Sequence, residues 1–406
     1  MRIIRVMGCP SFRYASQERY LVKFASDCKA LKHQLSIVYE NHPSSSSFQD
    51  KLKSVSADIF TIGPKRSKWK PSEGSPGNVY PKFLNLSPLL SFLKQIYWFF
   101  NIRKITNLQR IIQSQKVDII HSYFEPSNYA ILLGKLQSKK TFVTIGNPIT
   151  NKNISKLGFF EFIGIFWLAI FPLYFVDKII VLSNEIRSQL ISFGINKSRI
   201  SIIHSGIDTK YFSRDMARTK DIKSELGIED EFIIGFTGRL DKQKNLIFTL
   251  EIFAEVLKTL PSAKLILVGD GSMSQKIKQK IRELDLEQNV IMTGLRDDIR
   301  DILSVFNLYL STSLYEGKSS SVMESISLGV PVLSSNYKSA KETIVNGVNG
   351  FIIKSQNKKD FTDKIIHLER NRNELSRLVE TTQNYSACFD FSIRSKRTIE
   401  EYVMSK

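Results

Sequence analysis

Two glutamates, Glu316 and Glu324, are the residues of this sequence whose type and spacing could do chemistry. The stretch NLYLSTS, residues 307–313, predicts a short buried strand before Glu316. Gly329 and Pro331 predict the end of a helix that contains Glu324. We therefore expect Glu316 at the carboxyl end of a strand, where open α/β sheets bind ligands, and Glu324 in the first turns of the next helix.

Small residues separate the two glutamates. Gly317, Ser319 and Ser320 offer backbone N–H groups at the expected N-terminus of that helix. A helix N-terminus carries partial positive charge and donors without intrahelical partners, so this stretch outlines an anion site. The alternative is that both glutamates are solvated surface acids, but the flanking strand, helix and Gly-x-Pro sequence favour a functional site.

The stretch EGKSSSVMESISLGVPV, residues 316–332, resembles the signature of family-four retaining glycosyltransferases, roughly EGFGxxxxEAxxxGxPV. Lys318 and Ser319 stand where the family has Phe-Gly. The resemblance implies an α/β protein of the GT-B type, with two Rossmann-like doubly wound domains facing a central cleft. It also implies transfer of a sugar from a nucleotide-sugar donor with retention of configuration and without a metal.

A second group of residues follows the strand predicted for residues 232–237. The sequence GRLDKQKN begins at Gly238 and resembles the GRLxxxKG element, whose Arg and Lys bind the donor pyrophosphate in the family. Gly238 lets the backbone approach a ligand, Arg239 offers a planar fork to phosphate oxygens, and Lys244 offers a point charge. Fixed cations stabilise the charge that develops on a departing nucleoside diphosphate. The alternative is a pair of solvated surface cations.

The resemblance assigns a role to each of these residues. Glu316, Arg239 and Lys244 are expected to act in catalysis, with Glu316 orienting the hydroxyl groups of the donor sugar. Glu324 is expected to bind the ribose hydroxyls, and the backbone at Ser319 and Ser320 the pyrophosphate. A donor phosphate oxygen is the expected base for the acceptor hydroxyl. The turn with Leu295 borders the nucleotide base in the family, which makes Leu295 a further donor-binding candidate, together with Gly238.

The acceptor side is expected in the first half of the chain. The loop after the first predicted strand, residues 2–7, is glycine-rich in the family, but here it offers only Gly8. His121 ends a strand that resembles the family's DxxH strand, and it either lines the cleft or caps the strand. Gly146 stands where the family usually has a histidine that contacts the donor sugar.

The chain length of 406 residues predicts two domains. We expect an acceptor-side domain over residues 1–205 and a donor-binding domain over residues 206–385. Residues 386–406 are expected to form a helix that crosses back to the first domain. The polar stretch up to about Ile228 is the expected linker.

The net charge of +19 is unevenly distributed. Residues 1–200 contain 28 Lys and Arg against 11 Asp and Glu, which leaves +17 of the total on that half. No helix-turn-helix, zinc-finger or RNP signature accompanies this charge, so nucleic acid is not an expected partner. An anionic membrane surface is a better match, through an aromatic helix at residues 87–105 and a basic loop at residues 65–70. An ordinary core helix and a solvated loop are the alternatives.

Three cysteines without metal-ligand spacing favour a reducing compartment, and the N-terminus lacks the pattern of a secretory signal. The apolar run at residues 158–176 is interrupted by Glu161 and Pro172, so we expect a buried or partly inserted helix there. The predicted location is cytoplasmic, peripheral on the inner face of the cell membrane. No cofactor and no metal site are expected.

The sequence therefore predicts a retaining glycosyltransferase that uses a UDP- or GDP-linked sugar and a lipid-linked or saccharide acceptor, in bacterial surface polysaccharide or glycolipid assembly. Two alternatives stay open: a nucleotide-sugar 2-epimerase of the same architecture, and a catalytically silent polyanion-binding protein.

Overall fold

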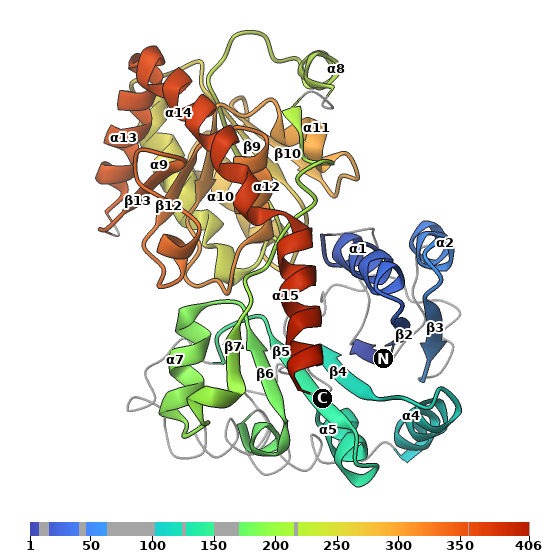
Figure 1. The fold of residues 1–406 in the computed structure, drawn as a ribbon. Coiled ribbons are helices and arrows are strands. Elements are labelled where there is room, and N and C mark those ends of the chain that lie inside the picture. The colour runs from blue at the N-terminus through green and yellow to red at the C-terminus, as the bar shows by residue number, and fades with distance from the viewer. Residues whose placement is uncertain are drawn as a thin grey trace. The chain divides into compact units, whose positions relative to one another are not determined.

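The computed structural model describes residues 1–7, 16–39, 46–62, 102–123, 127–149, 170–214, 218–355 and 357–405. It divides into two compact units, each with a parallel sheet and helices (Figure 1). The first unit contains the described residues up to Ser205 together with the helix that begins at Phe391, and the second contains Gly206–Asp390.

The first unit has a seven-stranded sheet with the order β3-β2-β1-β4-β5-β6-β7, and every pair of neighbours is parallel. Its strands are mostly buried, as expected for a parallel sheet that helices cover on both faces. They are β1 (Arg2–Met7), β2 (Gln34–Tyr39), β3 (Asp58–Thr61), β4 (Ile119–Tyr123), β5 (Lys140–Ile145), β6 (Lys178–Val181) and β7 (Ile200–Ile202).

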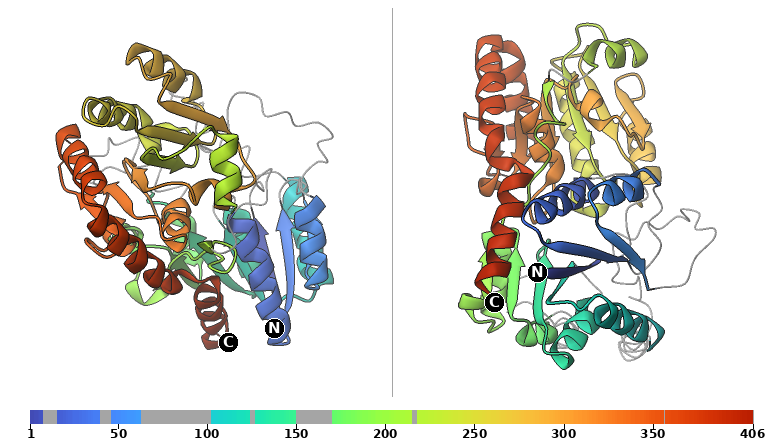
Figure 2. Two further views of the ribbon diagram at one scale, coloured as in Figure 1. Left: turned by 90° about the horizontal axis from the view of Figure 1, so that it is seen from above. Right: turned by 45° about the vertical axis from the view of Figure 1, so that its right-hand side comes forward.

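The helices of the first unit pack on the two faces of this sheet (Figures 1 and 2). One face carries a core in which Ile4, Val6 and Ile120 meet Leu108 and Leu133. The described helices of this unit are α1 (Ser16–Ala30), α2 (Ser46–Ser54), α4 (Ile102–Ser114), α5 (Ser127–Leu136), α7 (Asn184–Ser192) and α15 (Phe391–Met404), with the 3₁₀ turns η3 (Phe171–Phe175) and η4 (Lys197–Arg199).

The second unit has a six-stranded parallel sheet with the order β10-β9-β8-β11-β12-β13. Its strands are β8 (Ile233–Thr237), β9 (Lys264–Val268), β10 (Val290–Gly294), β11 (Leu308–Ser311), β12 (Val332–Ser335) and β13 (Gly350–Ile353). Its helices are α8 (Thr219–Glu225), α9 (Leu246–Leu257), α10 (Ser274–Glu283), α11 (Ile299–Leu303), α12 (Ser320–Ser327), α13 (Lys358–Arg370) and α14 (Arg372–Tyr385), with the 3₁₀ turns η6 (Lys242–Lys244), η7 (Ala340–Glu342) and η8 (Ser386–Phe389). Two doubly wound parallel-sheet units confirm the predicted α/β class.

Two expectations about the chain's organisation differ from the structure. The expected linker contains α8, whose Ile222 is buried and whose start is tied by Arg218 to Asp301 at 3.2 Å. The second unit ends at Asp390 and not at residue 385, because Ile207 forms a parallel bridge with Asp390. In both places, a few specific tertiary contacts hold a segment in the second unit, although its polar composition does not predict this.

His121 attaches α15 to the first sheet. The ring has no exposed surface, and its Nδ1 is hydrogen bonded to the hydroxyl of Tyr402 in α15. Its Nε2 lies 2.8 Å from Oγ1 of Thr144 in β5. Burial, together with the positive charges of Arg5 and Arg394, holds the pKa of His121 well below its ordinary value. The ring is therefore neutral when the protein is folded.

This neutral ring predicts a specific acid sensitivity. Below the ordinary histidine pKa of about 6.5, the unfolded chain binds a proton that the folded ring does not bind, so stability falls as pH falls. The loss approaches about 1.4 kcal/mol for each pH unit below that value. Scanning calorimetry of the full chain at pH 7.5 and 5.5 should show a smaller drop in unfolding temperature for His121→Gln than for the wild type. The partly exposed His33→Gln should keep the wild-type drop, and equal drops in all three proteins would contradict the assignment.

Candidate active site

The carboxyl ends of β8 and β11 lie side by side at the centre of the second sheet. The strand order reverses between them, since β9 and β10 continue on one side and β12 and β13 on the other. Ligands of open α/β sheets bind at such a switch point, outside the carboxyl ends of the strands. The segments with Gly238 and Glu316 both start at this edge.

Lys244 and Glu316 form an ion pair at this edge. Lys244 Nζ lies 2.5 Å from Glu316 Oε1, and both side chains are largely buried, at 11% and 7% exposure. Lys244 is in η6 after β8, whereas Glu316 follows β11. The structure therefore brings together two predicted site residues from separate motifs.

Further hydrogen bonds fix the Glu316 carboxylate in place. Ser313 Oγ donates to Oε1 at 2.8 Å, and Gln243 Nε2 donates to Oε2 at 3.2 Å and to the carbonyl of Tyr315 at 2.8 Å. Ser339 Oγ donates to the Glu316 carbonyl at 2.6 Å. Both carboxylate oxygens thus have donors, which is what a buried carboxylate requires.

The turn after β8 is packed backbone to backbone against the turn after β9. Gly238 has φ +150° and Gly269 has φ +131°, both in the range that favours glycine. A Cβ atom on Gly269 would lie 1.9 Å from the carbonyl oxygen of Gly238, and one on Gly238 would lie 3.8 Å from Lys244 Cε. Gly238 therefore lies directly beside the Lys244 stem, and Gly269 has no room for a side chain.

Arg239 projects from the same turn. Its side chain is 46% exposed, and the closest carboxylate is Asp241 Oδ2, at 3.4 Å from Nη2. The other Asp241 oxygen accepts from the backbone N–H of Lys244 at 3.3 Å and so caps η6. The guanidinium group is thus accessible at the edge where the ion pair lies, although it does not contact Glu316.

The N-terminus of α12 follows Glu316 after a short loop. Ser319 is the N-cap residue but makes no capping hydrogen bond with its side chain, and Ser320 begins the helix. Tyr309 Oη lies 2.9 Å from the Thr237 carbonyl oxygen and 3.0 Å from Ser321 Oγ, which ties β8 to the start of α12. Burial raises the pKa of Tyr309 to about 12, so its hydroxyl stays protonated.

The second predicted acid, Glu324, lies about one turn after the start of α12. Glu324 is buried within α12, with 7% of its surface exposed. Leu295 is 56% exposed on the turn after β10. The neighbouring Arg296 binds Glu225 and Asp298 through its guanidinium group, at 2.5–3.0 Å, which fixes this turn.

The acceptor-side predictions have a different outcome. Gly8 lies outside the described residues, as do the predicted membrane loop 65–70 and residues 87–101 of the predicted membrane helix 87–105. Residues 102–105 of that predicted helix belong to α4, where Lys104 is buried and Ile105 packs against the core. His121 is completely buried between β5 and α15, so the structure places it in the core of the first unit and does not support a direct contact with an acceptor. Gly146 follows β5 and is buried.

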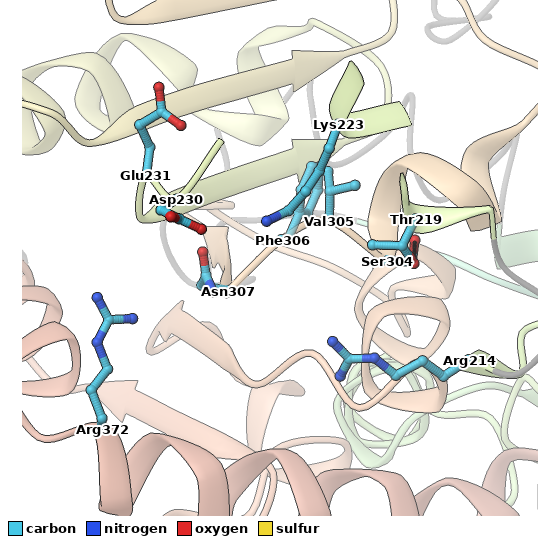
Figure 3. A pocket seen from close by; sticks show the side chains of 10 residues that line it. All are labelled: Arg214, Thr219, Lys223, Asp230, Glu231, Ser304, Val305, Phe306, Asn307 and Arg372. Atoms are coloured by element: carbon cyan, nitrogen blue, oxygen red, sulfur yellow. Dashed lines mark hydrogen bonds between the residues drawn. The ribbon is translucent and has the colours of Figure 1, made fainter. Parts of the chain in front are cut away.

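A separate hollow of about 300 Å³ lies at the opposite edge of the second sheet (Figure 3). Glu231 and Asn307 line it just before β8 and β11 begin, and Figure 3 shows the side chains of Arg214 and Arg372 reaching toward it from two sides. This hollow is remote from the carboxyl edge, and none of the predicted site residues lines it.

Within the described residues, no group of three or more His, Cys, Asp or Glu side chains could hold a metal ion. No helix in that part of the chain is long and apolar enough to cross a membrane.

Comparison with known proteins decides the family. The model of the Glycosyl transferases group 1 family matches residues 218–385, and the Glycosyltransferase Family 4 model matches residues 17–211. Together the two matches extend over most of the chain. The chain belongs to the GT-B glycosyltransferases of group 1. This confirms the family that the motifs around Gly238 and Glu316 indicate.

Individual relatives of this glycosyltransferase agree with that assignment. The UDP-Gal:alpha-D-GlcNAc-diphosphoundecaprenol alpha-1,3-galactosyltransferase of Escherichia coli is 24% identical over 66% of this chain and 70% of its own length. The N-acetylgalactosamine-N,N'-diacetylbacillosaminyl-diphospho-undecaprenol 4-alpha-N-acetylgalactosaminyltransferase of Campylobacter jejuni is 23% identical over 67% of this chain and 70% of its own. The crystal structure of Anabaena HepE in complex with UDP-glucose covers 100% of both chains with a TM-score of 0.76 and 17% identity, and so shares the fold.

Three positioning residues of the glycosyltransferase were not predicted from its sequence: Gln243, Ser313 and Tyr309. Gln243 directly precedes Lys244, and Ser313 ends the run of residues 307–313, so both lie next to predicted positions. Tyr309 occupies a strand interior, where an aromatic residue is ordinary. Only the tertiary contacts with Glu316 and Thr237 reveal what these side chains hold in place.

The ion pair predicts a stability effect that can be separated from activity. Lys244→Met leaves the Glu316 carboxylate buried without its cation, which should destabilise the enzyme by about 3–5 kcal/mol. Lys244→Met combined with Glu316→Gln removes both charges, so the double variant should regain most of that loss, as measured by urea unfolding. Lys242→Met, an exposed lysine of η6, is the matched control. A double variant as unstable as the single one would contradict a dominant role for the ion pair.

Proposed function

We propose that this glycosyltransferase moves a sugar from a nucleotide-sugar donor to a lipid-linked or saccharide acceptor, with retention of configuration and without a metal. The observation that carries the proposal is the buried Lys244–Glu316 pair at the switch point of the second sheet, beside the N-terminus of α12. The pair places a fixed carboxylate, which can bind sugar hydroxyls, next to cationic groups, which can bind a diphosphate. A nucleotide-sugar donor carries both kinds of group.

Lys244 serves two partners in this proposal. A lysine ammonium has three N–H donors, and one of them is directed to Glu316. The other two are available for oxygens of the donor diphosphate. Lys244 thereby joins the part of the site that binds phosphate to the carboxylate that orients the sugar hydroxyls.

The remaining diphosphate contacts come from Arg239 and the start of α12. The exposed guanidinium group of Arg239 can bind two phosphate oxygens at once, and the backbone N–H groups at Ser319 and Ser320 add donors at the positive end of the helix dipole. Glu324 binds the ribose hydroxyls, and Leu295 borders the nucleotide base. These groups stabilise the charge on the departing diphosphate, so a metal is not needed for that task.

Retention of the anomeric configuration follows from the base that we propose, a phosphate oxygen of the donor. Both Glu316 oxygens already accept hydrogen bonds from protein donors, so this carboxylate is suited to hold hydroxyl groups and not to attack the anomeric carbon. A phosphate oxygen of the donor then takes the proton of the acceptor hydroxyl, on the face that the diphosphate leaves. The acceptor oxygen therefore attaches on the same face.

The relatives support the proposed substrate classes. The names of the Escherichia coli and Campylobacter jejuni enzymes specify acceptors linked to diphosphoundecaprenol, and HepE was crystallised with UDP-glucose. We therefore favour a UDP-linked sugar over a GDP-linked one, and a lipid-linked acceptor in bacterial surface polysaccharide or glycolipid assembly. A lipid-linked acceptor also implies action at the inner face of the cell membrane.

A transfer assay with UDP-sugars in the presence of EDTA tests the reaction. Release of UDP should depend on acceptor and persist in EDTA, and the product should keep the donor's anomeric configuration by NMR. Arg239→Ala should lower kcat by about 10²–10³-fold, as for other single groups that stabilise developing charge. Lys242→Ala, an exposed lysine nearby, should leave kcat unchanged. An Arg239→Ala enzyme with normal turnover would show that the diphosphate binds elsewhere.

Calorimetric measurement of UDP binding distinguishes the roles of the two acids, Glu316 and Glu324. Glu324→Ala should weaken UDP binding, whereas Glu316→Ala should leave it nearly intact yet depress transfer. The exposed Glu287→Ala is the control for loss of an acid from the same unit. Equal losses of UDP affinity in the Glu316 and Glu324 variants would contradict the separate roles.

We also propose that the first unit docks on an anionic membrane through residues 87–101 and the loop 65–70. The charge of +17 on residues 1–200 supports this, because each basic residue near anionic lipid contributes about 1 kcal/mol. Co-sedimentation with anionic vesicles should weaken with salt without vanishing, since inserted rings are not screened. Trp98→Ser with Phe99→Ser should abolish the salt-resistant part. Equal pelleting with neutral and anionic vesicles would refute docking.

A further inference from the structure

Arg5 is an unusual residue for the centre of a parallel sheet. It lies in β1 with no exposed surface, and its guanidinium carbon is 3.6 Å from the centroid of the Phe24 ring in α1. Its hydrogen bond goes from Nη2 to the hydroxyl of Tyr402, at 3.3 Å. Nε and Nη1 are buried and have no hydrogen-bond acceptor among the described residues.

A second buried arginine lies close by in the same unit. Arg394 of α15 is 6% exposed, and its guanidinium carbon is 3.9 Å from the Tyr20 ring centroid and 5.5 Å from that of Tyr123. The Arg5 guanidinium carbon also lies 5.5 Å from each of these two ring centroids. The two cations therefore share one aromatic enclosure between β1, α1, β4 and α15.

No carboxylate among the described residues forms an ion pair with Arg5 or Arg394 in the structure. The aromatic rings interact with the faces of the guanidinium groups, but the N–H donors lie in the guanidinium plane and need acceptors there. Arg394 makes one long hydrogen bond, 3.5 Å to Ser205 Oγ. Two buried cations of like charge, with no anion beside them in the described part of the chain, are costly because each has lost its hydration.

We propose that Arg5 and Arg394 form a binding site for an oxyanion of the phosphate type. Such an anion supplies an in-plane acceptor at one edge of the Arg5 guanidinium group, for Nε or for Nη1, and compensates both charges. This inference concerns binding in the first unit alone, so it stands whether or not the proposed transfer reaction is correct. The same chemistry has two sources, a free inorganic anion or the phosphate carried by a lipid-linked acceptor.

The pKa of the neighbouring His121 is affected by the same two positive charges. His121 stands opposite Arg5 in the pairing of β4 with β1. Burial first, and then the charges of Arg5 and Arg394, lower its pKa. The two cations thus add to the effect of burial on His121, and a positive field of this kind attracts an anion.

Thermal unfolding in sodium phosphate, compared with sodium chloride of equal ionic strength, tests the site. Phosphate should raise the unfolding temperature of the wild type in a saturable way, because a ligand that binds only the folded state stabilises it by mass action. Arg5→Met and Arg394→Met should lose this rise, while Arg110→Met, an exposed arginine of α4, should keep it. An equal rise in all four proteins, or no rise in the wild type, would overturn the proposal.

Two further measurements make the test decisive. In chloride, Arg5→Met should be at least as stable as the wild type, because it replaces an uncompensated buried charge with an apolar side chain. A variant that is less stable in both salts would instead assign Arg5 a purely structural role. If Arg5→Met does not fold, Arg5→Lys keeps the charge without the planar fork and should bind phosphate more weakly than the wild type.

A final comparison identifies the source of the anion. A water-soluble prenyl diphosphate and inorganic phosphate are titrated separately, without any nucleotide sugar. Saturation at a lower concentration of prenyl diphosphate, lost in Arg394→Met, assigns the site to the acceptor's phosphate. Saturation by inorganic phosphate alone assigns it to a free anion. Neither titration depends on catalytic turnover of the enzyme.

Discussion

The ion pair between Lys244 and Glu316 is the interaction on which the second unit's site depends. Neither charge is stable alone in a buried position, so each residue requires the other. A buried pair of this kind adds little net stability, but it fixes the register of the segments that follow β8 and β11. The backbone contact of Gly238 with Gly269 constrains the first of these segments from its other side. Together these contacts hold the lysine at a defined place beside the N-terminus of α12.

Much of the fold can be predicted from the sequence because the strands of parallel sheets are buried on both faces. Residues 34–39 (QLSIVY) and 264–268 (KLILV) are mostly apolar segments between turn signals, and the strands β2 and β9 have these limits. The sequence does not predict that the expected linker contains the ordered helix α8. Ile222 is one apolar residue within a charged stretch, and its burial depends on packing against residues that are distant in sequence.

The candidate site shows the same division between local and tertiary information. The spacing of Gly238, Arg239 and Lys244, and that of Glu316 and Glu324, are local patterns and identify the two segments. Neither Gln243 nor Ser313 has a local signature. Gln243 contacts Glu316 from the turn after another strand, and Ser313 lies three residues before Glu316, where a serine is ordinary unless its side-chain contact is seen. His121 shows the opposite limit. The sequence predicts it at the end of a strand, but β4 continues to Tyr123, and a histidine in a strand looks the same in sequence whether its ring faces a ligand or a tyrosine from α15.

The position of α15 also has a consequence for the synthesis of the protein. This helix packs on the first sheet, yet the ribosome makes it only after the whole second unit. At roughly 5–20 residues per second, the first unit waits on the order of ten seconds or more for the helix that covers Arg5 and His121. During that interval the aromatic ring of Phe24 lacks its packing partner Tyr402. The first unit to leave the ribosome is therefore the last to be completed, and it needs protection from premature association until then.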